Sequence, residues 1–191
     1  MGFHDAIIMT ESKNNTNAEN KSSKPEKEIT EPTIQDLKDW KHMQGIMRHI
    51  SHVQQGAALM SERLFDRGDA TTARLLVQKV CGHDASKFIG IEWEHLRSDA
   101  DSTSAEFQAA LKQHQLTNDH HPEYWGSIKV MPPLCLAEMT CDWYARSTEF
   151  GTDLRDWVKN GACQKYGITT KTKCYKEIKS FVDILLDNKF K

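Results

Sequence analysis

The strongest constraint on the fold is a run of apolar residues that recurs every three or four positions between residues 34 and 64. It starts at Ile34 and ends at Leu64, with Thr33 before it as an N-cap and Gly68 after it as a stop signal. This spacing places the apolar side chains along one face of a helix about eight turns long. Such a helix needs other elements packed against its apolar face, so it organises the rest of the fold.

Shorter segments with the same helical spacing follow along the chain. They cover residues 75–80, 91–96, 104–114, 133–144, 154–158 and 172–186. Pro132 and Pro133 open one of these helices, and Gly151 ends it. No segment alternates between apolar and polar residues with a period of two, as a half-buried strand would. We therefore predict an all-α fold, a single domain of about six or seven helices.

The first 32 residues differ in composition from the rest of the chain. From Thr10 to Pro32 they are mainly Glu, Lys, Asn, Ser and Thr, with almost no large apolar side chains. Such a segment cannot bury enough apolar surface to offset the entropy lost on ordering. We expect residues 1–32 to form a flexible N-terminal tail and residues 33–191 to form the helical domain.

Composition and charge exclude several classes of function. The formal net charge is −2, and no basic stripe marks a dedicated nucleic-acid-binding surface. The chain lacks the glycine-rich phosphate loops of kinases, helicases and dinucleotide-binding proteins. Its five cysteines form no CxxC pair, and no apolar run approaches the roughly 18 residues needed to span a membrane. These features predict a cytoplasmic protein with reduced thiols and no membrane partner, and they leave a homo-oligomer open.

Histidine is concentrated in one part of the chain. Seven of the nine histidines lie between His49 and His121. The doublet His83-Asp84 follows a buried helical segment, where a charged pair needs a partner or a metal to offset its lost hydration. Capping or a local hydrogen bond is the alternative explanation of such a doublet. Imidazole and carboxylate ligands together favour Zn, Mn, Fe, Co or Ni over calcium.

Two further pairs of polar residues share a helix face. His114 and Asn118 are one helical turn apart, and so are Glu138 and Asp142. The two carboxylates lie on an otherwise apolar helix and would repel each other unless a cation or a base lay between them. A solvated edge of that helix is the alternative explanation.

The order of these residues resembles that of the HD-domain superfamily of metal-dependent phosphohydrolases: a histidine, a His-Asp doublet, further histidines and a late aspartate on a separate helix. Four blocks carry the resemblance, namely HISHV, HDASKF, HxxxNxHHPEYW and EMTCDW. They fall between His49 and Tyr166 and are similar to a compact, uncharacterised HD-like family. The resemblance implies an HD-like helical domain that hydrolyses a nucleotide or another small phosphate ester.

The resemblance also implies the metal ligands. It predicts a primary site whose four ligands are His49, His83, Asp84 and Asp142. His49 is preferred over His52 because in that family a valine, here Val53, follows the ligand by four residues. Three more residues fall where larger HD enzymes bind a second metal, namely His114, His120 and His121. We expect one of the adjacent His120 and His121 to point away, because neighbouring residues in a turn seldom share a target. The predicted cofactor is one or two divalent ions of Mn, Fe, Co, Ni or Zn.

The ligand set suggests a mechanism. A metal with three or four protein ligands and an open position lowers the pKa of its water towards about 7 and prepares that water to attack phosphorus. Lys87 lies about one turn beyond Asp84 and can bind a phosphate as a point charge. The candidates for proton shuttle are Glu92, Glu94 and Glu123, and the sequence does not choose among them. Asn118 is a candidate for orienting the water or the substrate.

Three alternative functions are consistent with these sequence features. The first, which we favour, is a phosphohydrolase that acts on a small phosphorylated substrate through a metal-activated water. The second is a di-iron oxygenase of the HD type, which would use six His and Asp ligands. The third is a non-catalytic HD-like module that binds a nucleotide or a partner.

Overall fold

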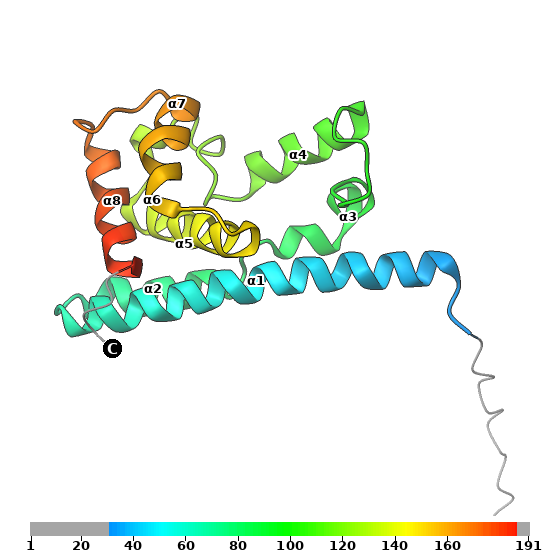
Figure 1. Ribbon diagram of the computed structural model, residues 1–191, viewed down its shortest axis with the longest axis horizontal. Helices are drawn as coiled ribbons and strands as arrows, with labels where there is room; N and C mark the ends of the chain where they lie inside the picture. The colour runs from blue at the N-terminus through cyan, green and yellow to red at the C-terminus, as the bar shows by residue number, and fades with distance from the viewer. Residues whose placement is uncertain (1–30, 187–191) are drawn as a thin grey trace, which may run out of the picture. The chain divides into compact units, whose positions relative to one another are not determined.

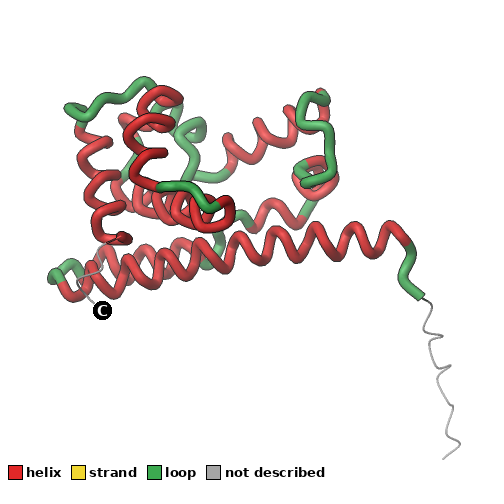
Figure 2. The backbone as a smooth tube through the Cα atoms, viewed as in Figure 1, coloured by secondary structure: helices red, strands yellow, loops and turns green. Residues whose placement is uncertain are grey.

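The computed structural model of the protein describes residues 31–186, and within them every regular element is a helix (Figures 1 and 2). The α-helices are α1 (Ile34–Asp66), α2 (Ala70–Val80), α3 (Gly90–His95), α4 (Ala105–Thr117), α5 (Pro133–Phe150), α6 (Leu154–Asp156), α7 (Cys163–Tyr166) and α8 (Lys173–Leu186). Two 3₁₀ turns are η1 (Ala85–Phe88) and η2 (Ile128–Val130), and the π-helix η3 (Trp157–Ala162) joins α6 to α7 without a break. The predicted all-α fold is confirmed.

The predicted boundary between tail and domain lies at the edge of the described residues. The helical unit begins at Thr33. The flexible tail was predicted for residues 1–32, of which only Glu31 and Pro32 are described, so that prediction lies outside the described part of the chain.

Both ends of α1 follow from local sequence chemistry. The hydroxyl of Thr33 accepts a hydrogen bond from the backbone N–H of Asp36 at 3.1 Å, and the Asp36 carboxylate accepts one from the backbone N–H of Thr33 at 2.8 Å. This reciprocal capping box satisfies backbone groups that the first turn leaves unpaired. At the other end Gly68 has a φ of +89°, a left-handed conformation that favours glycine, and the chain turns there into α2.

The C-terminal half of α1 supplies the core. Val53, Ala57 and Met60 are fully buried and pack in one cluster with Leu76 of α2 and Leu185 of α8. Figure 1 shows α2 and α5 lying along this half of α1. A second cluster centres on α5 and α8, and the continuous segment from α6 to α7 covers it.

Helices α1 and α5 approach closely at a glycine. A Cβ atom on Gly56 would lie 2.9 Å from the ring carbon Cδ1 of Tyr144 on α5, nearer than real Cβ contacts come. Glycine at this position therefore sets how near the two helices lie.

The apolar face predicted for the N-terminal half of α1 is largely exposed. Its periodic apolar residues Ile34, Leu37 and Trp40 are 77%, 50% and 55% exposed, so helical spacing overstated the extent of the buried face. An ion pair of 2.8 Å between Arg97 Nη1 and Asp39 Oδ1 ties the loop after α3 to this half of the helix. No helix among the described residues combines the length and apolar character needed to cross a lipid bilayer.

Candidate metal centre

Five separate segments carry the predicted metal ligands to one place. His49 comes from α1, the doublet His83-Asp84 from the turn after α2, and Asp142 from α5. The remaining histidines come from α4 and the loop that follows it, namely His114, His120 and His121. All seven predicted ligands meet in a buried cluster.

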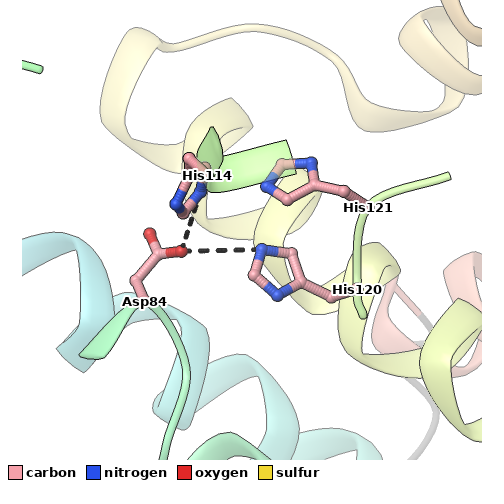
Figure 3. A group of neighbouring side chains, drawn as sticks. All are labelled: Asp84, His114, His120 and His121. Atoms are coloured by element: carbon pink, nitrogen blue, oxygen red, sulfur yellow. Dashed lines mark ion pairs between the residues drawn. The ribbon is translucent and has the colours of Figure 1, made fainter. Parts of the chain in front are cut away.

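Asp84 occupies the middle of this cluster. Its Oδ2 atom lies 3.6 Å from Nε2 of His49 and 3.7 Å from Nε2 of His83. Its Oδ1 atom lies 3.3 Å from Nε2 of His114 and 3.5 Å from Nε2 of His120. Each oxygen of one carboxylate therefore faces a different pair of histidines, and Figure 3 shows the His114 and His120 rings directed at the same oxygen.

The backbone of Asp84 has an unusual, left-handed conformation. Its φ of +56° is left-handed, and no other non-glycine residue among those described has a positive φ. Aspartate tolerates this conformation better than most residues, although it is disfavoured for any side chain with a Cβ. Strained backbone of this kind is concentrated at functional sites, and here it turns the carboxylate into the cluster.

The predicted ligands alone form two groups of metal-binding size, in addition to a third in which Glu138 joins His83 and His120. One contains His49, His83 and Asp142, with Nε2 of His49 at 3.0 Å from Oδ1 of Asp142. The other contains Asp84, His114, His120 and His121. Within each group the atoms lie within 4.8 Å of one another, so one ion can reach them all. Because Asp84 also contacts His49 and His83 of the first group, its carboxylate lies between the two groups.

Several of these atoms have no hydrogen-bond partner although they are buried. They include Nε2 of His49, His83, His120 and His121 and one carboxylate oxygen each of Asp84 and Asp142. Buried polar atoms are rarely left unpaired, because each then loses its hydration without compensation. Here the unpaired atoms converge, and they are the nitrogen and oxygen donors that divalent transition metals bind. The residues therefore fit a metal.

The expectation that His120 or His121 points away is wrong. Both rings lie in the cluster, with centroids 4.3 Å apart, and each belongs to the group around Asp84. The two residues lie in a tight turn, where the backbone N–H of His121 donates to the carbonyl of Asn118 at 3.0 Å. This irregular backbone lets adjacent side chains converge, which the alternation of a strand would prevent.

Electrostatics favour the protonation states that metal binding needs at three of the predicted ligands, Asp84, His120 and His121. At His83 burial acts to lower the pKa, but the hydrogen bond with Glu138 and the nearby carboxylates outweigh it and raise that pKa. Burial would raise the pKa of Asp84, but the close contact with His114 and the charge of Lys87 outweigh it and hold that pKa well below its ordinary value. Burial lowers the pKa of His120 to about 4 and that of His121 to about 3. Near pH 7 the aspartate is thus ionised and these two imidazoles are neutral, as metal ligands must be.

Glutamates stand behind the ligand histidines. Glu138 Oε1 lies 3.1 Å from Nδ1 of His83, Glu149 Oε1 lies 3.0 Å from Nδ1 of His49, and Glu92 Oε2 lies 2.8 Å from Nδ1 of His114. A carboxylate on Nδ1 fixes the ring and leaves Nε2 free to bind a metal. Sequence reasoning assigned no such role to Glu138 or Glu149. Their spacing from Asp142, four residues before and seven after on the same helix, was the available signal.

Four of the five residues predicted to act in catalysis have different positions, and the fifth, Glu94, is 65% exposed and lies 3.8 Å from His95. Lys87 Nζ lies 2.6 Å from Oδ2 of Asp84, beside the cluster. Glu92 is buried behind His114, so it is placed to orient that ring. Asn118 ends α4 and donates to Ser86 Oγ at 3.0 Å, which ties the helix end to η1.

The fourth, Glu123, is not joined to the ligand cluster by any described contact. One of its carboxylate oxygens is buried without a hydrogen-bond partner among the described residues. Of the predicted catalytic set, Lys87 is therefore the residue that the fold places directly at the centre.

A cavity of about 370 Å³ opens beside His49 and His114. Four cationic residues line it, namely Lys41, Lys87, Arg97 and Arg146, and no aspartate or glutamate is among its described lining residues. Three of these cations are paired with carboxylates, Lys87 with Asp84, Arg97 with Asp39 and Arg146 with Glu149, so their positive charge is partly offset. A larger cavity of about 610 Å³, near Arg63 and Leu185, contains none of the candidate ligands.

Comparison with known proteins gives a family without a known activity. No curated protein and no solved structure matches the chain. One family model matches residues 38–187, which include every residue of the metal cluster. The chain belongs to that family, a family of unknown function called DUF5662.

Proposed function

We propose that this chain is a metal-dependent phosphohydrolase of the HD type that acts on a small phosphate ester. The observation that carries the proposal is the convergence of buried, unpaired ligand atoms on both oxygens of Asp84, next to a cavity lined by cations. The first half of this observation supports binding of divalent metal, and the second supports an anionic substrate at the same place.

Two ions fit the ligands better than one. His49, His83 and Asp142 with Oδ2 of Asp84 would hold the first, and the remaining histidines with Oδ1 of Asp84 would hold the second. The donors are mostly imidazole, which favours Mn, Fe, Co, Ni or Zn. Ions at these positions would supply an activated water at neutral pH and stabilise charge on the phosphate oxygens.

The residues of the chain contribute orientation and charge. Glu138, Glu149 and Glu92 hold the ligand rings in place, so that little reorganisation is needed when substrate binds. Lys87 lines the cavity and contacts Asp84, which supports a role for its ammonium in pairing with a phosphate oxygen at the centre. The cavity lies in the range of size typical of sites for small ligands, which suits a small ester such as a nucleotide.

The test combines metal content with hydrolysis. Protein purified without chelator is analysed for transition metals, and hydrolysis of p-nitrophenyl phosphate and bis(p-nitrophenyl) phosphate is measured with added Mn or Co. We expect one to two equivalents of metal and phosphate-ester hydrolysis that Asp84→Asn abolishes. His95→Asn is the matched control, because this half-exposed histidine lies outside the cluster and should leave both readings unchanged.

Other outcomes would favour the competing functions. Bound iron with oxygen consumption and no phosphate-ester hydrolysis would favour a di-iron oxygenase. Absence of metal after purification and after reconstitution would refute the phosphohydrolase and leave a binding module.

A further inference from the structure

The cavity extends from the metal centre along α1. His49, Ile46, Gly45 and His42 all line it, and they are spaced by three and four residues on one face of that helix. At 1.5 Å of rise per residue, His42 lies about 10 Å along the helix from His49. A molecule with its phosphate at the metal centre would therefore place its opposite end near His42.

His42 has the properties of a ligand-binding residue. It is only 9% exposed, and its Nε2 atom is buried without a hydrogen-bond partner among the described residues. Its ring packs against Trp93, with centroids 4.8 Å apart, so its position is fixed. Burial, followed by the nearby charge of Arg97, lowers the pKa of His42, which makes the ring neutral near pH 7. A fixed neutral imidazole suits recognition of an uncharged polar atom.

The walls between His42 and the metal centre are largely apolar. Ile46 of α1 faces this space, as do Phe107 and Leu111 of α4. Apolar walls with a few placed polar groups are typical of sites that bind a flat or apolar body and fix its orientation. At the far end Lys41 and Arg97 add positive charge, although Arg97 is already paired with Asp39.

We propose that His42 forms a specificity subsite that hydrogen-bonds the non-reacting end of the substrate. The substrate class is a phosphate monoester whose body is flat or apolar and ends in an uncharged hydrogen-bonding edge. This inference rests on the proposed phosphohydrolase function, because that function places the phosphate at the metal centre.

The test compares short and long probes on the metal-loaded protein. The probes are phosphonates, in which carbon replaces the ester oxygen: methylphosphonate, benzylphosphonate and the phosphonate analogues of the four common nucleoside 5′-monophosphates. Their dissociation constants are measured by titration calorimetry. We expect at least one long probe with a polar edge to bind several-fold more tightly than methylphosphonate.

His42→Phe is the informative variant because it keeps an aromatic ring against Trp93 and removes both ring nitrogens. It should weaken binding of the favoured long probe about three- to tenfold, the worth of one hydrogen bond, and leave methylphosphonate binding and metal content unchanged. His42→Gln should restore part of the loss. His95→Phe, a change at a histidine outside the cavity, is the control and should have no effect.

The possible outcomes distinguish failure of the His42 subsite from failure of the proposed phosphohydrolase function. Failure of methylphosphonate to bind the metal-loaded protein would count against the phosphohydrolase. Normal methylphosphonate binding with no gain for any longer probe would refute the subsite alone. The subsite is also refuted if His42→Phe weakens short and long probes equally, or weakens neither.

Discussion

Glu138 is a carboxylate that lies near a histidine of each candidate group of metal ligands. Its Oε1 atom lies 3.1 Å from Nδ1 of His83 and 3.8 Å from Nδ1 of His120, which belong to different groups. Its Oε2 atom lies 3.3 Å from Nζ of Lys79, and the residue is 2% exposed. Replacement of this one residue should therefore weaken metal binding without changing any of the seven predicted ligands.

The informative change is Glu138→Gln, which keeps the shape of the side chain and removes its charge. Loss of such a supporting carboxylate typically lowers metal affinity 10- to 100-fold, which corresponds to about 1.4–2.8 kcal/mol. Lys79 retains Asp119 as a partner at 2.7 Å, so the change leaves no cation buried without an anion. We therefore expect a folded protein with weakened metal binding.

The assay is competition between the protein and a chelator of known affinity, with Zn or Mn as the metal. Glu94→Gln is the matched control, because the Glu94 side chain is 65% exposed and, within residues 31–186, its ion pair is with His95 at 3.8 Å. Thermal unfolding of the metal-free variant shows separately whether the fold is intact. If Glu138→Gln binds metal within about twofold of the unchanged protein, well inside the range expected for a supporting carboxylate, the assigned role of Glu138 is wrong.

Three further predictions follow from the same geometry. Asp84→Asn should remove bound metal from both groups of ligands, because each oxygen of Asp84 faces one group. Elemental analysis measures the loss of metal, and full retention of two ions would contradict the prediction. Gly56→Ala should destabilise the protein by about 1–3 kcal/mol in urea unfolding, because its Cβ would lie 2.9 Å from the Tyr144 ring, and unchanged stability would show that the ring shifts freely. Metal-free protein should lose stability as the pH falls from about 6.5 to about 4.5. Burial lowers the pKa values of His120 and His121 to about 4 and 3 in the folded protein, whereas the same histidines in the unfolded chain take up protons near pH 6.5. Urea midpoints that stay constant or rise over this range would refute the prediction.

The sequence was informative wherever chemistry or spacing is local. The cap at Thr33, the stop at Gly68, the opening of α5 at Pro133 and its end at Gly151 are all where the sequence predicts them. Each depends on a few neighbouring residues, so no tertiary information is needed. The exposure of the apolar residues in the first turns of α1 was not predictable from local sequence. Helical periodicity identifies an apolar face, but it does not show whether another element covers that face.

The ligand residues were identifiable because histidine and the His-Asp doublet are chemically distinctive, and a family resemblance supplied their order. The supporting glutamates were not, because Glu149 and Glu138 look like any helical glutamate until α1 and the turn after α2 are packed beside α5. Which atom Glu92 contacts was likewise not identifiable before the helices are packed. A carboxylate near a metal can move protons or hold a histidine, and only its 2.8 Å contact with Nδ1 of His114 distinguishes the two.

The His120-His121 doublet shows where a general rule failed. Adjacent residues diverge on a strand because successive side chains point to opposite faces, and on a helix because they are separated by about 100°. The loop after α4 follows neither geometry: its hydrogen bonds run from His121 back to Asn118 and from Tyr124 back to His121. Within that succession of tight turns both rings point to the same centre from one short segment, across from Asp84. The second metal group therefore depends on the conformation of this loop, and the conformation of such a loop is the part of a fold that residue spacing predicts least.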